Sequence, residues 1–321
     1  MYTLTCEMRV YTEKGVYHLK ALTKVEISLK RSQLTQTCKV TLPKNVRWDG
    51  QKTLPLKRGN AVEVYLGYDG NNELAFSGYL TGIGVQTPME LTMEDDMWKM
   101  KQWPTVKKAY RSVDLETLLK DQNLPYDVSV YGTTAIGAFR VEKDNVSELL
   151  QQFYDNGFRF FFCTDKTGVP VLHGGILMDR SEGKCLVVST GVNLIEDKDL
   201  KRVYADKVRI HAISTQGMNG KKISVEVGSK DKDANEYRIY ATGKTEEELR
   251  AYAEAKLTEY QRDGLAGKLT TFGGRLVGLL DHVAVKIDAQ RRGIYQIEAN
   301  EISFGTEGYR QTITLGRKTG N

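Results

Sequence analysis

The residues best suited to metal binding or nucleophilic chemistry are few and widely separated along the chain. The sequence of 321 residues contains four histidines, His18, His173, His211 and His282. No two of them have the spacing of the HExxH metal motif. Each lies in a predicted strand or at a strand edge without a matched partner, so we interpret each as structural.

The four cysteines also lack a motif. They are Cys6, Cys38, Cys163 and Cys185. None belongs to a CxxC pair, so they predict neither a zinc site nor a disulfide framework. Reduced, packed thiols are typical of proteins that assemble in a cytoplasm. The chain does not open with a signal sequence, and no apolar run reaches the ~18 residues of a membrane helix.

Two short motifs hint at chemistry, yet each fits a structural role better. Residues 263–268 (DGLAGK) resemble a phosphate loop, but too few residues separate the first glycine from the Gly-Lys pair. They also follow a predicted helix, so we interpret them as a helix stop and loop. The acidic run Glu94, Asp95 and Asp96 could bind a hard cation, but it favours the N-terminus of a short helix, whose amides attract negative charge.

Composition narrows the function classes further. Hydrophobic residues make up 40% and charged residues 27%, as in a globular chain, and the net charge of +5 is spread without a basic block. The 17 tyrosines suit protein interfaces, and they equally suit stacking on glycans or single-stranded nucleic acid. We predict no catalytic, metal-binding or cofactor-binding residues. Two alternatives to a purely structural protein stay open. One is a β-rich glycan- or single-strand-binding module, and the other is a metal hydrolase that uses the acidic run.

The elements around these residues begin with strands. The first hundred residues alternate apolar and polar side chains with a period of two, which is typical of strands that bury one face. Residues 24–30 and 37–42 are clear cases. Residues 69–72 (DGNN) predict a hairpin turn between strands 61–68 and 74–83, because Gly and Asn accept positive φ.

The middle of the chain changes to a helical period. Asn145 is the predicted N-cap of a helix, with Glu148 completing a capping box. Gly157 is expected to end this helix in the left-handed conformation. A phenylalanine-rich strand at residues 158–162 and a turn at residues 165–168 follow. Together they predict a small α/β domain.

Two further helices are predicted from capping signals. One follows Ser112, the expected N-cap, and places the leucines of residues 115–119 (LETLL) on one face. The other begins at a capping box formed by Thr245 and Glu248 and is expected to stop at Gly264.

An approximate internal repeat links the two ends of the chain. Residues 60–66 (NAVEVYL) resemble residues 281–287 (DHVAVKI), and each copy leads into a strand with Gly and Tyr and then into an apolar strand ending at Ile83 or Ile302. A duplicated β-barrel around an inserted domain explains this pattern.

We therefore predict a mainly β fold with an α/β insert. Two similar β-barrel domains, residues 1–105 and 196–321, flank a small α/β domain of residues 106–195. A helix near residues 245–263 is inserted in the second barrel. The whole is an α+β chain without a catalytic constellation.

The same residues resemble a known family. Residues 56–68 (LKRGNAVEVYLGY) and 76–83 (FSGYLTGI) resemble the first barrel of phage tail and baseplate hub proteins, the late control protein D family. The N-terminal hub part of type VI secretion spike proteins is similar. Residues 293–297 (GIYQI) and 308–315 (GYRQTITL) resemble the second barrel, and the helix after Asn145 fits the insert. The resemblance spans nearly the whole chain and rests on the order of elements.

The resemblance implies a structural, non-enzymatic hub of a contractile phage, a prophage or a related injection system. Hubs of this family are homotrimers whose six barrels match a sixfold tail tube and a threefold spike. The implied partners are further copies of the chain, a tail tube protein, a spike protein and other baseplate proteins. DNA would only pass through the channel, and no membrane insertion is implied.

The implied location is the virion tail or baseplate, after assembly in the bacterial cytoplasm. The sequence ends soon after the second barrel, at Asn321. Because no β extension or needle repeat follows it, we expect the spike to be a separate polypeptide.

Overall fold

The computed structural model describes residues 2–44, 46, 55–132, 135–165, 168–178, 183–197, 199–204, 207–216 and 221–320. The chain packs into two compact units. The first unit contains Met1–Trp98, Lys184–Leu200 and Gly267–Gly316, and the second contains Lys99–Gly183, Lys201–Ala266 and Arg317–Asn321. This grouping reflects packing, and the three domain ranges expected from the sequence stay a prediction.

The first unit is built from strands. They are β1 (Leu4–Thr12), β2 (Gly15–Leu19), β3 (Lys24–Lys30), β4 (Thr37–Thr41), β5 (Ala61–Tyr68), β6 (Asn71–Ile83), β7 (Glu90–Glu94), β13 (Cys185–Ser189), β14 (Leu194–Glu196), β20 (Lys268–Phe272), β21 (His282–Lys286), β22 (Arg292–Gly305) and β23 (Gly308–Gly320). The short helix α1 (Met97–Met100) follows β7.

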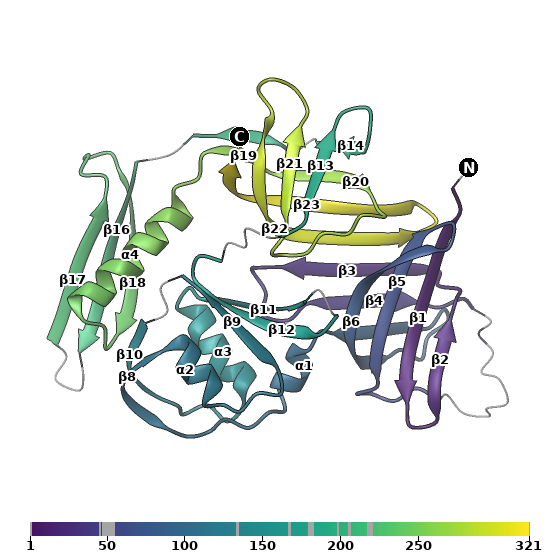
Figure 1. The fold of residues 1–321 in the computed structure, drawn as a ribbon, viewed down its shortest axis with the longest axis horizontal. Coiled ribbons are helices and arrows are strands. Elements are labelled where there is room, and N and C mark those ends of the chain that lie inside the picture. The colour runs from purple at the N-terminus through teal and green to yellow at the C-terminus, as the bar shows by residue number, and fades with distance from the viewer. Residues whose placement is uncertain are drawn as a thin grey trace. The chain divides into compact units, whose positions relative to one another are not determined.

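These strands form a single thirteen-stranded sheet (Figure 1). Its order is β14-β20-β23-β22-β3-β4-β7-β6-β5-β1-β2, with β21 paired to β22 and β13 paired to β21. We call β1–β7 the first half and β13, β14 and β20–β23 the second half. The two halves meet where β22 pairs with β3, in antiparallel register from Ala299 opposite Lys30 to Gly305 opposite Lys24.

The two halves share one strand order. The first half runs β3-β4-β7-β6-β5-β1, and the second runs β14-β20-β23-β22-β21-β13. If the strands of the two halves are matched by their position in the sheet, the matched strands also follow one another in the same order along the sequence. The direction of one strand differs between the halves, because β1 is antiparallel to β5 while β13 is parallel to β21.

The mainly β class is confirmed, but the halves are open rather than closed barrels. The edge of β3 that faces away from β4 pairs with β22. The first half therefore does not close into a barrel by pairing β3 with β1 or β2. Among the described residues, the sheet therefore has three edge strands, β2, β14 and β13, because β13 pairs only with β21. In the second half, the segment between β14 and β20 forms part of the second unit. In the first half, the matching strands β3 and β4 are joined only by a turn.

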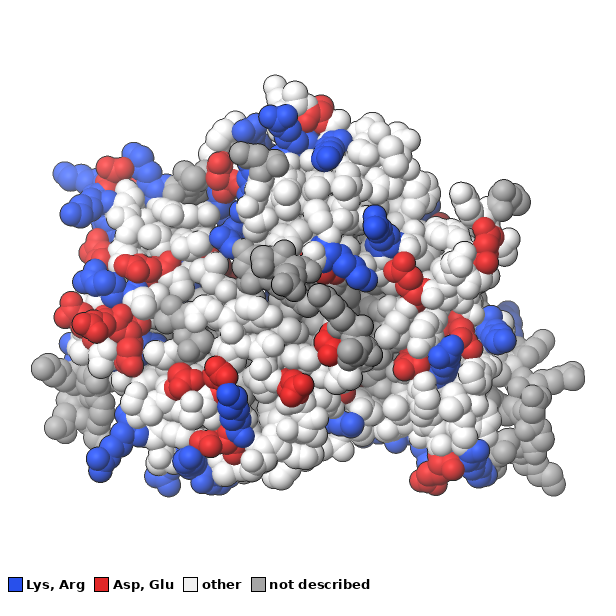
Figure 2. Space-filling view, in the orientation of Figure 1, with Lys and Arg blue, Asp and Glu red and all other residues white. Residues whose placement is uncertain are grey.

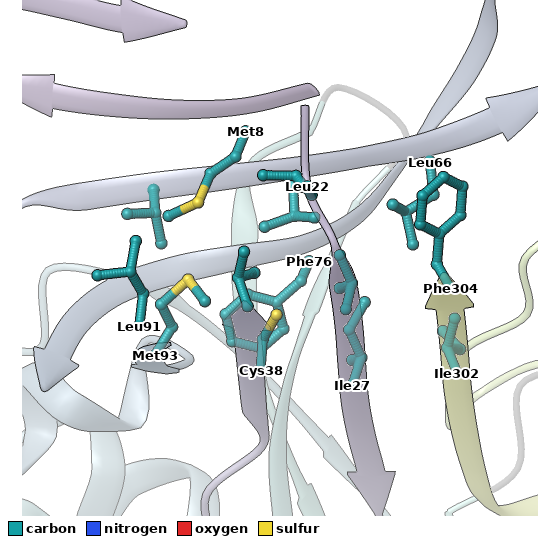
Figure 3. Packing of buried hydrophobic residues seen from close by; sticks show 14 of the residues in the cluster. Met8, Leu22, Ile27, Cys38, Leu66, Phe76, Leu91, Met93, Ile302 and Phe304 are labelled. Carbon is teal, nitrogen blue, oxygen red and sulfur yellow. The ribbon is translucent and has the colours of Figure 1, made fainter. Parts of the chain in front are cut away.

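Alternation of side chains decides which face of each strand is buried. Val25 and Ile27 of β3 are buried between exposed or half-buried neighbours, and Cys38 and Val40 of β4 follow the same rule, as predicted. Figure 3 shows part of the resulting core, in which Phe304 of β22 belongs to the same cluster as the residues of the first half. Burying side chains of this size contributes about 1.5–3 kcal/mol each.

The predicted hairpin between β5 and β6 is confirmed. Asp69 and Gly70 both have positive φ, 52° and 86°, which matches the twist of the strands that they join. β6 begins at Asn71, a few residues earlier than expected, because Asn71 and Asn72 already pair with Tyr68 and Gly67.

The second unit combines small sheets with helices. Its elements are β8 (Ala109–Asp114), α2 (Leu115–Lys120), β9 (Asp127–Tyr131), β10 (Ala135–Arg140), α3 (Val146–Asp155), β11 (Arg159–Thr164), β12 (Pro170–Gly175), β15 (Lys201–Val203), β16 (Val208–Gln216), β17 (Lys221–Gly228), β18 (Asn235–Thr242), α4 (Glu246–Tyr260) and β19 (Gly264–Ala266). The sheets are β11-β12-β9, β17-β16-β18, β10-β8 and β15-β19. Of the turn predicted at residues 165–168, Lys166 and Thr167 lie outside the described residues.

The helix caps are partly as predicted. Asn145 caps α3 by accepting the main-chain N–H of Glu148, and Gly157 after the helix has φ +88°. The N-cap of α2 is Asp114 rather than Ser112, because β8 continues to Asp114 and the helix starts after it.

The capping box of α4 at Thr245 and Glu248 is confirmed. The helix ends at Tyr260 with Gln261 as its C-cap, so the stop expected at Gly264 was wrong. Gly264 already belongs to a strand, because residues Gly264–Ala266 pair with β15.

Candidate assembly surface

The side chains that suggested chemistry are not gathered at one place. The histidines lie on four strands: His18 on β2, His173 on β12, His211 on β16 and His282 on β21. His18 Nδ1 lies 2.8 Å from Glu7 Oε1. The buried His173 has its Nδ1 3.0 Å from the Tyr131 hydroxyl. Among the described residues, no group of three or more His, Cys, Asp or Glu side chains could hold a metal ion.

The acidic run lies where β7 gives way to α1. The main-chain N–H of Met97 donates to Asp95 Oδ1 at 3.2 Å, so the predicted role at the start of the helix is confirmed for Asp95. Asp95 is 5% exposed, and burial raises its pKa well above the ordinary range. Its Oδ2 atom has no hydrogen-bond partner within the described part of the chain.

The structure also shows the surroundings of the motif that resembles a phosphate loop and of the four cysteines. Residues 263–268 contain β19, so the helix stop and loop expected there are replaced by a short strand pair. All four cysteines are free thiols. Cys38 is buried, but Cys185 is exposed, which corrects the expectation of packed thiols. On β13 the inward positions belong to Leu186 and Val188, and Cys185 alternates to the outer face.

Charge on the surface is mixed. Figure 2 shows basic and acidic side chains interspersed over the visible face. This fits the expectation that the net charge is spread without a basic block. Among the described residues, no helix has the length and apolar character needed to cross a membrane.

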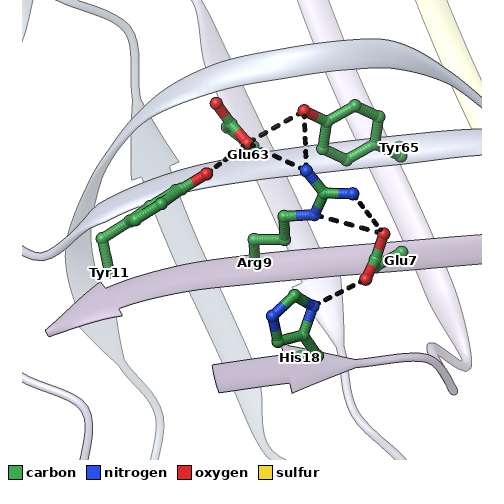
Figure 4. Close-up of polar contacts among 6 residues, drawn as sticks. All are labelled: Glu7, Arg9, Tyr11, His18, Glu63 and Tyr65. Atoms are coloured by element: carbon green, nitrogen blue, oxygen red, sulfur yellow. Dashed lines mark hydrogen bonds and ion pairs between the residues drawn. The ribbon is translucent and has the colours of Figure 1, made fainter. Parts of the chain in front are cut away.

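A polar network covers neighbouring strands at the β2 edge of the sheet (Figure 4). Arg9 of β1 donates from Nη2 to Glu7 Oε2 at 2.9 Å, and its guanidinium lies 4.4 Å from the centre of the Tyr65 ring. Tyr11 and Tyr65 both donate to Glu63 Oε2, at 2.7 and 2.9 Å. Cross-strand pairs of this kind stiffen a sheet.

The network shifts the proton affinities of its members. Hydrogen bonds to His18 and then Arg9 lower the pKa of Glu7. Burial, followed by the hydrogen bond to Glu63, raises the pKa of Tyr65 to about 12. Glu7 therefore stays charged and Tyr65 stays neutral at neutral pH. Arginine and tyrosine held in this way suit a contact surface between proteins.

The junction between the two halves of the sheet is held by both backbone and side-chain contacts. Beyond the backbone pairing of β22 with β3, Lys30 forms an ion pair with Glu301 at 2.6 Å across the junction. Arg31 is 8% exposed and donates from Nη2 to the main-chain oxygen of Leu279 at 2.7 Å. The hydrogen bond from Lys30 lowers the pKa of Glu301.

Apolar side chains complete the same junction. Ile302 is 3% and Phe304 is 5% exposed, and both belong to the core of the first half. The C-terminal half of β22 thus supplies an edge partner and core side chains to a sheet made from the other end of the chain. This arrangement holds the two halves of the sheet together.

The comparisons with solved structures agree over almost the full length. A tail protein from Neisseria meningitidis MC58 is 13% identical with a TM-score of 0.68, covering 98% of this chain and 97% of that one. The 43 kDa tail protein of prophage MuSo2 from Shewanella oneidensis is 15% identical with a TM-score of 0.60, covering 97% and 98%. The chain has the fold of phage tail proteins.

A further match is an Escherichia coli component of the type VI secretion system. It is 12% identical with a TM-score of 0.57, and the match covers 93% of this chain and 74% of that one. That protein is described as structurally similar to T4 tail proteins. No family model and no curated protein matches the chain. The tail and baseplate resemblance predicted from the sequence is therefore confirmed as a likeness of fold.

Sequence reasoning missed the residues of the tail-protein fold that join its two halves. Arg31 and Glu301 each follow a strand pattern in which charged side chains are expected to face solvent. Their partners, Leu279 and Lys30, lie far away in the sequence. The repeat was the available signal, because it placed Ile83 and Ile302 at matching positions.

Proposed function

We propose that this chain is a structural hub subunit in the tail baseplate of a contractile phage, a prophage or a related injection system. Three copies form a ring that matches a sixfold tail tube on one side and a threefold spike on the other. The spike is a separate protein, other baseplate proteins bind around the ring, and DNA passes through its channel. The subunit is assembled in the bacterial cytoplasm and has no enzymatic activity.

The observation that carries this proposal is the repeated strand order of the two halves. A chain with two similar sheets offers two similar surfaces. Three such chains offer six, which is what contact with a sixfold partner requires. The predicted ranges 1–105 and 196–321 are the two tube-facing domains in this proposal, and 106–195 is the insert between them.

The likeness of fold supports the same proposal. The similar structures are tail proteins and a type VI secretion component.

The test is the native mass and symmetry of the full-length protein. Light scattering after gel filtration, from low micromolar to the highest soluble concentration, should approach three times 36.2 kDa. Electron-microscopic class averages along the symmetry axis should then show a ring with six similar lobes and a central channel. A strict monomer at every concentration contradicts the proposal, and so does a trimer without sixfold lobes.

A further inference from the structure

The three-stranded sheet of the second unit has an open edge at β17. Its order is β17-β16-β18, so β17 has one strand neighbour among the described residues (Figure 1). The main-chain N–H of Ser229 donates to Val208 at 2.8 Å, and the antiparallel ladder between β16 and β17 continues from there. In such a ladder every second residue directs its backbone groups away from the paired strand. The backbone groups of Lys222, Ser224 and Glu226 therefore point out from the edge.

The two faces of β17 carry different side chains. On one face Val225 is 4% exposed and Ile223 is half-buried, because α4 packs against this face. The opposite face carries Lys222, Ser224 and Glu226, which are all exposed. An edge strand with outward backbone groups and a partly covered apolar face is a template for a further strand.

The sequence of this edge is complementary to itself. Residues 222–226 read KISVE, with a basic side chain at one end and an acidic one at the other. In an antiparallel pair of two copies centred on Ser224, each Lys222 lies opposite the Glu226 of the other copy. Ile223 then lies opposite Val225 on the face that α4 covers. Opposite charges and apolar side chains placed directly across two strands stabilise the pair.

We propose that β17 pairs with β17 of a second copy, in antiparallel register centred on Ser224, so that one sheet continues across the two copies. The contact uses the same surface on both copies and is therefore two-fold. A closed ring of three copies has no such axis between its members, so the contact joins copies of different rings and goes beyond the proposed function. One strand pair buries little surface, so the contact is weak and is best detected by cross-linking.

The first test cross-links the wild-type protein. A carbodiimide joins a lysine amine directly to a carboxylate, so it links Lys222 to Glu226 only where the two side chains meet. Within one strand these residues lie about 13 Å apart, so the reaction requires two copies. A mixture of unlabelled and ¹⁵N-labelled protein, digested and analysed by mass spectrometry, should contain Lys222–Glu226 products that carry the label in only one of their two peptides. The absence of such mixed products overturns the inference.

The second test places a thiol on the two-fold axis. Ser224→Cys is made in a Cys185→Ser background, because Cys185 is an exposed thiol. Two copies of residue 224 lie directly opposite each other in the proposed register, at a separation that a disulfide spans. Mild oxidation should therefore give a covalent dimer on a non-reducing gel. The matched control Lys222→Cys lies opposite Glu226 and should give at least about tenfold less dimer, and equal yields overturn the inference.

Charge reversal tests the register. Adding Lys222→Glu to the Ser224→Cys protein places like charges opposite each other at both ends of the pair, and it should lower the dimer yield about tenfold. Adding Glu226→Lys as well restores opposite charges and should recover the yield. A double reversal that cross-links no better than Lys222→Glu alone overturns the inference. The native mass remains the test of the ring, so failure of the β17 contact leaves the proposed function standing.

Discussion

Lys244 of the second unit should make the stability of the protein depend on pH in the alkaline range. It is 4% exposed, its ammonium group donates to the main-chain oxygen of Ala135, and it lies 5.4 Å from the centre of the Tyr252 ring. Burial lowers the pKa of Lys244 from 10.5 to about 8. The folded protein therefore binds this proton less tightly than the unfolded chain does.

The direction of the effect follows from that difference. Below pH about 8 the charged side chain is buried at full cost, and the cost disappears as the pH rises to about 10.5, where the unfolded chain also loses the proton. Each factor of ten in proton affinity is worth about 1.4 kcal/mol. The contribution of Lys244 to the free energy of unfolding should therefore rise by about 2–3 kcal/mol between pH about 7 and about 10.

Lys244→Met isolates this contribution, because methionine fills a similar space without a charge. Urea unfolding, followed by circular dichroism, should show the wild type gaining about 2–3 kcal/mol on the variant as the pH rises over this range. The exposed Lys232→Met serves as control, and its difference from wild type should not change with pH. A wild-type-minus-Lys244→Met difference that is constant with pH would refute the reasoning.

Three further outcomes are expected. Asp95→Asn should stabilise the first unit by about 1 kcal/mol near neutral pH, and the gain in thermal unfolding should shrink as the pH falls, because burial raises the pKa of the carboxyl; a gain independent of pH would contradict this. Gly157→Ala should lower the free energy of unfolding in urea by about 2 kcal/mol, and Gly168→Ala should lower it by about 1 kcal/mol. Both glycines have a positive φ, +88° and +86°, but only at Gly157 would the new Cβ lie 2.5 Å from Lys256 Cε. Equal losses for the two variants would contradict an effect of this contact. Phe304→Ala should cost about 3–5 kcal/mol, and a loss below about 1 kcal/mol would mean that the junction is not part of the core.

Local signals predicted the helices and the tight turn well. The caps at Asn145 and Thr245, the left-handed Gly157 and the Asp69-Gly70 turn are all where they were expected. Each depends on hydrogen bonds between residues three or four apart, or on a single backbone conformation. Such features are decided before any distant part of the chain arrives.

The errors arose where a distant strand competed with a local signal. Ser112 was expected to cap a helix, but β8 pairs with β10 up to Asp114 and delays the start. Gly264 was expected to end a helix, but pairing with β15 makes it the first residue of β19. In both cases the backbone hydrogen bonds of a strand partner outweighed a capping preference of about 1 kcal/mol.

By itself, the sequence determined the mainly β class, the buried face of strands such as β3 and β4, the helix N-caps at Asn145 and Thr245, and the repeat of two similar halves. Only the tertiary structure decided that β22 lies beside β3 and that both halves stay open. The physical reason is that alternation of side chains specifies which face of a strand meets the core, whereas the backbone groups along its edge are the same for every residue. The neighbour that fills an edge is therefore chosen by the packing of the whole sheet.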